Sequence, residues 1–132
     1  MRTIFVVDDD EAVRDSLKLL LESYGMAVEA YRSTAEFARQ YRPRACQCLL
    51  LDLHLPGTTG LDFLASSDGA RLRLPVVLLS GRAEAAMRAR AAALGVSAFL
   101  EMPVSANVLM AAIEQALGDR KAGDGEAIRR DS

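Results

Sequence analysis

Short, continuous hydrophobic runs alternate along the chain with longer segments that have helical features. Three of the runs are rich in Val, Ile and Leu: residues 4–7, 49–51 and 76–79. Runs of this kind are typical of strands buried on both faces, as in a parallel sheet covered by helices. Residues 27–31 and 98–100 are predicted to form two further strands.

The segments between these strands carry helical periodicity or helix start and stop signals. Hydrophobic residues recur at helical spacing between positions 13 and 24, and Gly25 follows as a stop signal. Ser33 and Glu36 have the spacing of a capping box, which opens a helix. Three further helices are predicted: near residues 61–64, over the alanine-rich residues 83–94, and from a cap at Ser105 to Gly118.

This alternation of strands and helices predicts an α/β domain. Because crossovers between parallel strands are right-handed, five such pairs give a doubly wound sheet with helices on both faces. Residues 119–132 are mostly polar and contain one large apolar side chain, Ile128. We therefore expect one domain over residues 1–118, followed by a polar tail or the start of a linker.

Composition narrows the class of protein. Of the 132 residues 51% are hydrophobic and 26% charged, which is ordinary for a globular protein. The formal net charge of −2 argues against nucleic acid as a ligand, since such domains usually have a basic footprint. Neither a membrane-spanning run nor a signal peptide is expected, and Cys46 and Cys48 are too few for a disulfide framework. The expected location is the cytoplasm, with both cysteines interpreted as small buried hydrophobes beside a strand.

Acidic residues follow two of the predicted strands directly. Asp8, Asp9 and Asp10 follow the first strand, and Asp52 follows the run at 49–51. If these strands are neighbours, Asp8, Asp9 and Asp52 converge in one crevice, because ligands of open α/β sheets bind at the carboxyl ends of the strands. Two carboxylates 4 Å apart repel by roughly 4 kcal/mol at an effective dielectric near 20, so the cluster favours binding of a cation. Mg²⁺ suits it best, because this ion prefers oxygen ligands and accepts few of them from the protein.

A simpler interpretation is that these acids are solvated loop residues or helix caps. It suits Asp10, which stands immediately before the first predicted helix. It suits Asp8 and Asp9 less well, because both follow a fully apolar strand and Asp52 matches them on another.

Several motifs in a fixed order resemble the receiver domain of bacterial two-component response regulators. The resemblance covers residues 3–117 and depends on VVDDD at 6–10, LDLHLPG at 51–57, Gly60, LSG at 79–81 and Pro103. It implies a flavodoxin-like, doubly wound, five-stranded parallel sheet in the order 2-1-3-4-5. It also implies a signalling phosphoacceptor rather than an enzyme, with a sensor histidine kinase or a phosphotransfer protein as partner.

The resemblance assigns a role to individual side chains. Asp52 would accept the phosphoryl group as an aspartyl phosphate. Asp9 would hold Mg²⁺ directly and Asp8 through water, with Asp52 and the backbone carbonyl of His54 as further ligands. Ser80 would donate a hydrogen bond to the phosphoryl group, and Phe99 stands at the position of the switch aromatic. The face formed by the fourth helix, fifth strand and fifth helix would make homodimer or effector contacts.

The chain departs from the family pattern at Met102. Receivers usually place a lysine just before the proline that follows the fifth strand, and that lysine pairs with the phosphoryl group. A thioether cannot do so, and the chain's lysines, Lys18 and Lys121, lie elsewhere. We expect phosphorylation to remain chemically possible with weaker switching, and Arg82 is a candidate substitute for the missing cation.

Two other functions remain open on the sequence. The first is a phosphorylation-independent pseudo-receiver that acts as a protein-interaction module, which Met102 favours. The second is a phosphatase similar to the haloacid dehalogenase superfamily, with Asp8 rather than Asp52 as nucleophile. That superfamily also needs a lysine and a cap segment, usually in a longer chain.

Overall fold

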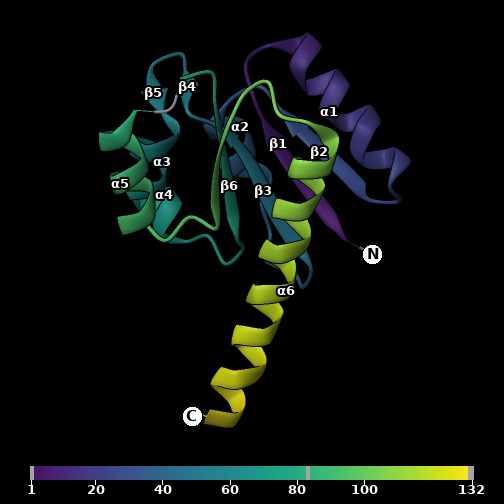
Figure 1. Ribbon diagram of the computed structural model, residues 1–132. Helices are drawn as coiled ribbons and strands as arrows, with labels where there is room; N and C mark the ends of the chain where they lie inside the picture. The colour runs from purple at the N-terminus through teal and green to yellow at the C-terminus, as the bar shows by residue number, and fades with distance from the viewer. Residues whose placement is uncertain (1, 83, 131–132) are drawn as a thin grey trace.

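Five parallel strands form the central sheet of the computed structural model, which describes residues 2–82 and 84–130 (Figure 1). The strand order is β2-β1-β3-β6-β7, which is the flavodoxin-like order 2-1-3-4-5 when only these five strands are counted. The predicted fold class is therefore confirmed. The strands are β1 (Thr3–Val7), β2 (Ala27–Tyr31), β3 (Gln47–Asp52), β6 (Val76–Ser80) and β7 (Ala98–Glu101).

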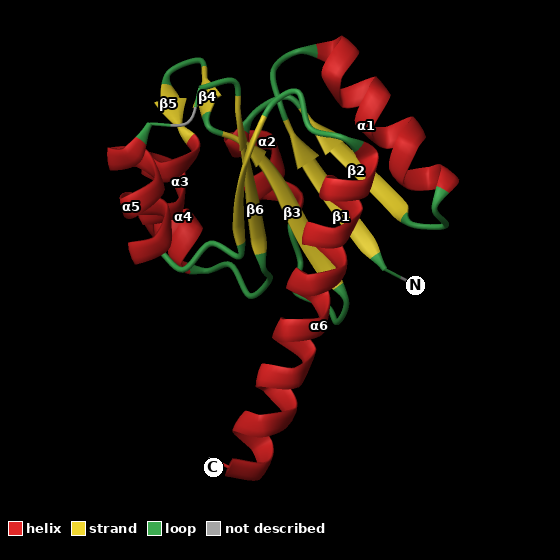
Figure 2. Ribbon diagram, viewed as in Figure 1, coloured by secondary structure: helices red, strands yellow, loops and turns green. Residues whose placement is uncertain are grey.

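Helices cover both faces of this sheet (Figure 2). One core cluster joins the sheet to α1 and α6, and a second joins its other face to α2, α3 and α5. Burial on both faces explains why the strands are continuous hydrophobic runs rather than alternating ones. The helices are α1 (Glu11–Ser23), α2 (Thr34–Gln40), α3 (Gly60–Ala65), α4 (Ser67–Ala70), α5 (Ala85–Ala93) and α6 (Ala106–Arg130).

The helix start signals act as predicted. The carboxylate of Asp10 accepts hydrogen bonds from the backbone N–H groups of Ala12 and Val13 at the start of α1. Ser33 Oγ accepts from Glu36 N at 3.1 Å, and Ser105 Oγ accepts from Val108 N at 3.2 Å. These hydrogen bonds satisfy backbone donors that a helix leaves unpaired in its first turn.

The last helix does not end at Gly118 as predicted. Instead α6 continues to Arg130 and extends beyond the sheet (Figure 1). A glycine costs only about 1 kcal/mol in a helix interior, and the following residues include good helix formers such as Lys121, Ala122 and Glu126. The segment predicted as a polar tail is thus helical over residues 119–130, while residues 131–132 of that prediction lie outside the described residues.

Three local features differ from the sequence interpretation. A two-stranded hairpin, β4 (His54–Leu55) with β5 (Thr58–Thr59), and the short helix α4 were not predicted. Both are too short to give a periodic pattern. Cys48 is buried within β3 as expected, whereas Cys46 is exposed. Cys46 lies immediately before β3, with a φ of 61°, and is therefore not one of the strand residues that the helices cover.

Candidate functional site

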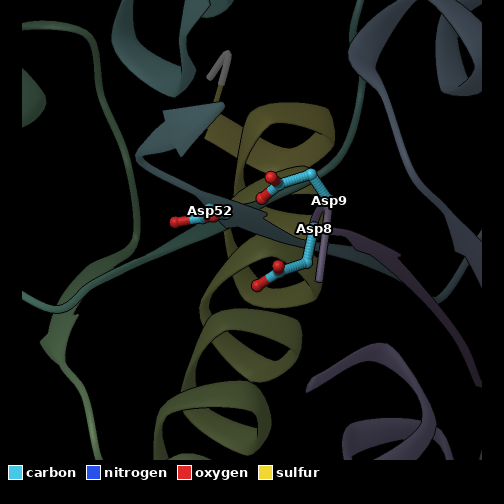
Figure 3. A group of neighbouring side chains, drawn as sticks. All are labelled: Asp8, Asp9 and Asp52. Carbon is cyan, nitrogen blue, oxygen red and sulfur yellow. The ribbon is translucent and has the colours of Figure 1, made fainter. Parts of the chain in front are cut away.

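Three aspartates meet at the carboxyl edge of the sheet. Asp8 and Asp9 follow β1, and Asp52 is the last residue of the neighbouring strand β3. Each of the three offers a carboxylate oxygen, and these atoms all lie within 4.8 Å of one another. Figure 3 shows the three carboxyl groups gathered on one side of the strands. The convergence predicted from the strand ends is confirmed.

Crowding and burial make this cluster electrostatically unfavourable without a cation. Burial, with the neighbouring charges of Asp8 and Asp9, raises the pKa of Asp52 to about 6. Burial is also the main cause that raises the pKa of Asp8, to which the charges of Asp9 and Asp10 add. Backbone hydrogen bonds act in the opposite direction, since Asp10 N donates to Asp8 Oδ1 at 2.9 Å and His54 N donates to Asp52 Oδ1 at 3.2 Å.

The donor set fits a hard divalent cation. Carboxylate oxygens close together, with one exposed and two at least partly buried, suit the few protein ligands that Mg²⁺ accepts. The side chain of His54 is not part of the cluster, and this residue is exposed on β4. Asp10 caps α1 and is therefore not needed as a ligand.

Two further residues support the cluster: Arg14, which was not singled out from the sequence, and Gly60, which belongs to the motifs of the family resemblance. Arg14 Nη1 donates to the backbone carbonyl of Asp8 at 2.7 Å, and its positive charge lowers the pKa of Asp8. Gly60 lies so close to the end of β3 that a Cβ there would be 2.7 Å from the backbone oxygen of Asp52. Arg14 lies six residues after Asp8, among polar positions of the first predicted helix. Its place in the sequence therefore did not predict the contact with the Asp8 carbonyl.

Ser80 lies at the end of β6, on the strand next to Asp52. It is buried, and its hydroxyl donates to the backbone oxygen of Arg82 at 2.5 Å while accepting from Arg82 N at 3.0 Å. The strand register pairs Asp52 with Leu79, which places Ser80 one residue further along the neighbouring strand. Arg82 lines an open pocket of about 570 Å³ together with His54, Gly81, Glu84 and Met87.

Met102 packs away from charge and against the hydrophobic core. Its side chain contacts the core cluster shared by β1, α1 and α6, and it lines an apolar groove of about 320 Å³ with Leu17, Leu20 and Leu109. The backbone N–H of Met102 donates to the carbonyl of Ser80 at 2.7 Å, so the main chain is held beside β6. The position predicted to lack a phosphate-binding cation is thus occupied by a partly buried thioether that packs against the core.

Phe99, in the middle of β7, is partly buried and lies under a cation. The guanidinium carbon of Arg88 is 4.8 Å from the centre of the Phe99 ring. Arg88 Nη1 also donates to the backbone oxygen of Phe99 at 3.2 Å. Arg88 is exposed, yet it makes a specific contact from α5 to β7.

Comparison with known proteins decides the family. Residues 4–114 match the family model described as the response regulator receiver domain. The chain belongs to this family. A receiver is a signalling domain of a two-component response regulator and is not a classical enzyme, so the phosphatase alternative loses its basis.

Curated relatives and solved structures agree with this assignment. The transcriptional regulatory protein FixJ of Azorhizobium caulinodans is 35% identical over 115 residues, which cover 87% of this chain and 54% of that protein. The response regulator protein TodT of Pseudomonas putida is 32% identical, over 86% of this chain and 50% of that protein. The crystal structure of full-length FixJ from B. japonicum matches with a TM-score of 0.85 and 30% identity, over 98% of this receiver and 64% of that chain.

The receiver spans about half the length of these curated relatives. Within residues 2–82 and 84–130, every helix is too short or too polar to cross a bilayer.

Proposed function

We propose that this receiver accepts a phosphoryl group on Asp52 from a phosphohistidine of a sensor kinase or phosphotransfer protein, with Mg²⁺ held by the acidic cluster, in the cytoplasm. The observation that carries the proposal is the convergence of the Asp8, Asp9 and Asp52 carboxylates within 4.8 Å of one another. Membership of the receiver family supports it.

In the proposed transfer, a carboxylate oxygen of Asp52 attacks phosphorus and the bond from phosphorus to the histidine nitrogen breaks. The nitrogen keeps the electron pair, and the product is an aspartyl phosphate. Asp8, Asp9, Asp52 and the backbone carbonyl of His54 would hold Mg²⁺, which supplies neutralisation of the negative charge on the transferring group. Since the cluster is crowded with negative charge, binding a cation also keeps Asp52 ionised as a nucleophile.

Two further residues have proposed roles after transfer. Ser80 would exchange its hydrogen bond to the Arg82 backbone for one to a phosphoryl oxygen, because its hydroxyl can rotate. Phe99 would act as the switch aromatic, and Arg88 holds it in the present position.

The direct experiment is incubation with acetyl phosphate and Mg²⁺, followed by measurement of intact mass. We expect a phosphoryl adduct that is absent in Asp52→Ala and is strongly reduced when EDTA removes the metal. An adduct of equal yield in Asp52→Ala would refute the assignment of Asp52.

A second function, that of a phosphorylation-independent interaction module, is favoured by Met102. Its side chain packs against the core and offers no positive charge to a phosphoryl group. The same experiment separates the two functions, since a wild-type chain that forms no adduct supports the interaction module. If an adduct does form, Arg82→Ala tests the substitute cation: unchanged yield and lifetime would exclude Arg82 from that role.

A further inference from the structure

Arginines gather at the edge of the sheet opposite the acidic cluster. Residues 37–51 and 69–80, which lead into β3 and β6, contain neither Asp nor Glu. Because these strands are parallel neighbours, with Leu49 paired to Val76, both entry segments lie at the same edge. The arginines of the two segments are Arg39, Arg42, Arg44, Arg71 and Arg73, and all five are exposed.

Part of this group surrounds a pocket between α2 and α4. The pocket has a volume of about 420 Å³ and is lined by Ala35, Ala38, Arg39, Arg42, Asp68 and Arg71. A hydrogen bond of 3.0 Å from Arg73 N to the hydroxyl of Tyr41 joins the end of α2 to the segment that enters β6. Tyr41 is buried, so the two walls of the pocket are held together by the core.

The guanidinium groups around the pocket keep donors available for a ligand. Arg42 donates through Nη1 to the backbone oxygens of Arg39 and Tyr41, which leaves its other nitrogens unused within the described chain. Arg71 makes one long contact to Asp68 at 3.4 Å. The side chain of Arg39 makes no hydrogen bond or ion pair with any residue that the structure describes. Three cations and one carboxylate give the lining a net charge of +2.

We propose that this pocket binds a small ligand that carries a diphosphate group. Planar guanidinium groups form paired hydrogen bonds with phosphate oxygens, and several arginines around one cavity suit adjacent phosphates better than a single carboxylate. The volume lies within the usual range of small-molecule sites. The local charge stands out because the whole chain has a formal charge of −2.

The pocket is independent of the phosphoacceptor site. It lies at the amino ends of β3 and β6, whereas Asp8, Asp9 and Asp52 lie at the carboxyl ends of β1 and β3. A ligand here would therefore leave the acidic cluster accessible.

Calorimetric titration of the purified chain with inorganic pyrophosphate, in low salt with EDTA, tests the proposal. We expect saturable binding that weakens by roughly tenfold or more in Arg39→Gln/Arg71→Gln, since each charge-assisted contact to phosphate is strong. Arg2→Gln/Arg90→Gln removes the same charge from other surfaces, where these arginines pair with Glu114 and Asp62, and serves as the matched control. Asp68→Asn removes the one acidic group of the lining and should strengthen binding severalfold.

The expected pattern differs from that of a general charge effect. The control variant should bind pyrophosphate as the wild type does, and so should Asp52→Asn, which also separates this proposal from the phosphoacceptor function. The proposal is overturned if the wild type shows no saturable binding or if the control loses as much affinity as Arg39→Gln/Arg71→Gln. It is equally overturned if Asp52→Asn abolishes binding or if citrate binds as tightly as pyrophosphate.

Discussion

Replacing Asp52 by Asn should stabilise the metal-free domain at neutral pH. The folded structure raises the pKa of Asp52 from 3.8 to about 6, chiefly by burial and next by the charge of Asp8. A raised carboxyl pKa means that the folded chain holds a proton which the unfolded chain has released. Between those two pKa values the free energy of unfolding therefore falls as the pH rises. Above a pH of about 6 the ionised Asp52 destabilises the folded chain by its full amount.

The magnitude follows from the same values. A pKa that rises from 3.8 to about 6 corresponds to about 3 kcal/mol, and because Asp52 is only partly buried, solvent screening reduces the expected effect to about 1–2 kcal/mol. Asn keeps an oxygen that can accept the hydrogen bond from His54 N and removes only the charge. We expect Asp52→Asn to be more stable than the wild type by this amount at pH 7.5.

Urea denaturation in EDTA at pH 7.5 and at pH 4 measures the effect. The stability difference should be present at the higher pH and small at the lower one, where the wild-type carboxyl is protonated. Saturating Mg²⁺ at pH 7.5 should stabilise the wild type more than Asp52→Asn, since the ion binds only the folded cluster. A wild type that is at least as stable as Asp52→Asn at pH 7.5 without metal would refute the reasoning.

Three other substitutions test separate parts of the structure. Gly60→Ala should destabilise the domain by about 1–3 kcal/mol in urea denaturation, because the new Cβ would be 2.7 Å from a backbone oxygen. An unchanged free energy of unfolding would show that α3 shifts freely. Met102→Lys supplies a charge-assisted hydrogen bond to the phosphoryl group, worth about 1.5–3 kcal/mol. Acetyl phosphate should therefore change hydrogen exchange around β7 more in this variant than in the wild type or in Met102→Leu. Equal changes in all three proteins would count against this role for a lysine at position 102. Arg88→Ala should increase the motion of the Phe99 ring, which NMR would detect as faster ring flipping. Unchanged flipping would mean that the Arg88 guanidinium, 4.8 Å from the ring centre, does not hold the ring.

Much of the sheet could be predicted because its signals are strong and local. The runs at 4–7, 49–51 and 76–79 are hydrophobic on both faces, which is typical of a parallel sheet covered by helices. The alternation of elements predicted helices on both faces, but the strand order came from the family resemblance. Helix ends were less predictable, since Gly118 weakens a helix without stopping one whose neighbours favour it.

The acidic site was predictable in its residues but not in its surroundings. The sequence indicates the three proposed ligands because each follows an apolar strand: Asp8, Asp9 and Asp52. The parallel topology then brings their carboxylates together. The contacts of Arg14 with the Asp8 carbonyl and of Arg88 with Phe99 depend on side-chain reach across the fold. The position of Met102 against the core depends on residues that α1 and α6 bring to the same cluster.

The most direct test of the account identifies the phosphorylated residue itself. Borohydride reduces an aspartyl phosphate to homoserine, so the treated chain can be digested and each aspartate position read by peptide mass. After exposure to acetyl phosphate and Mg²⁺, we predict homoserine at position 52. An unmodified position 52, or homoserine at position 8 instead, would contradict the account.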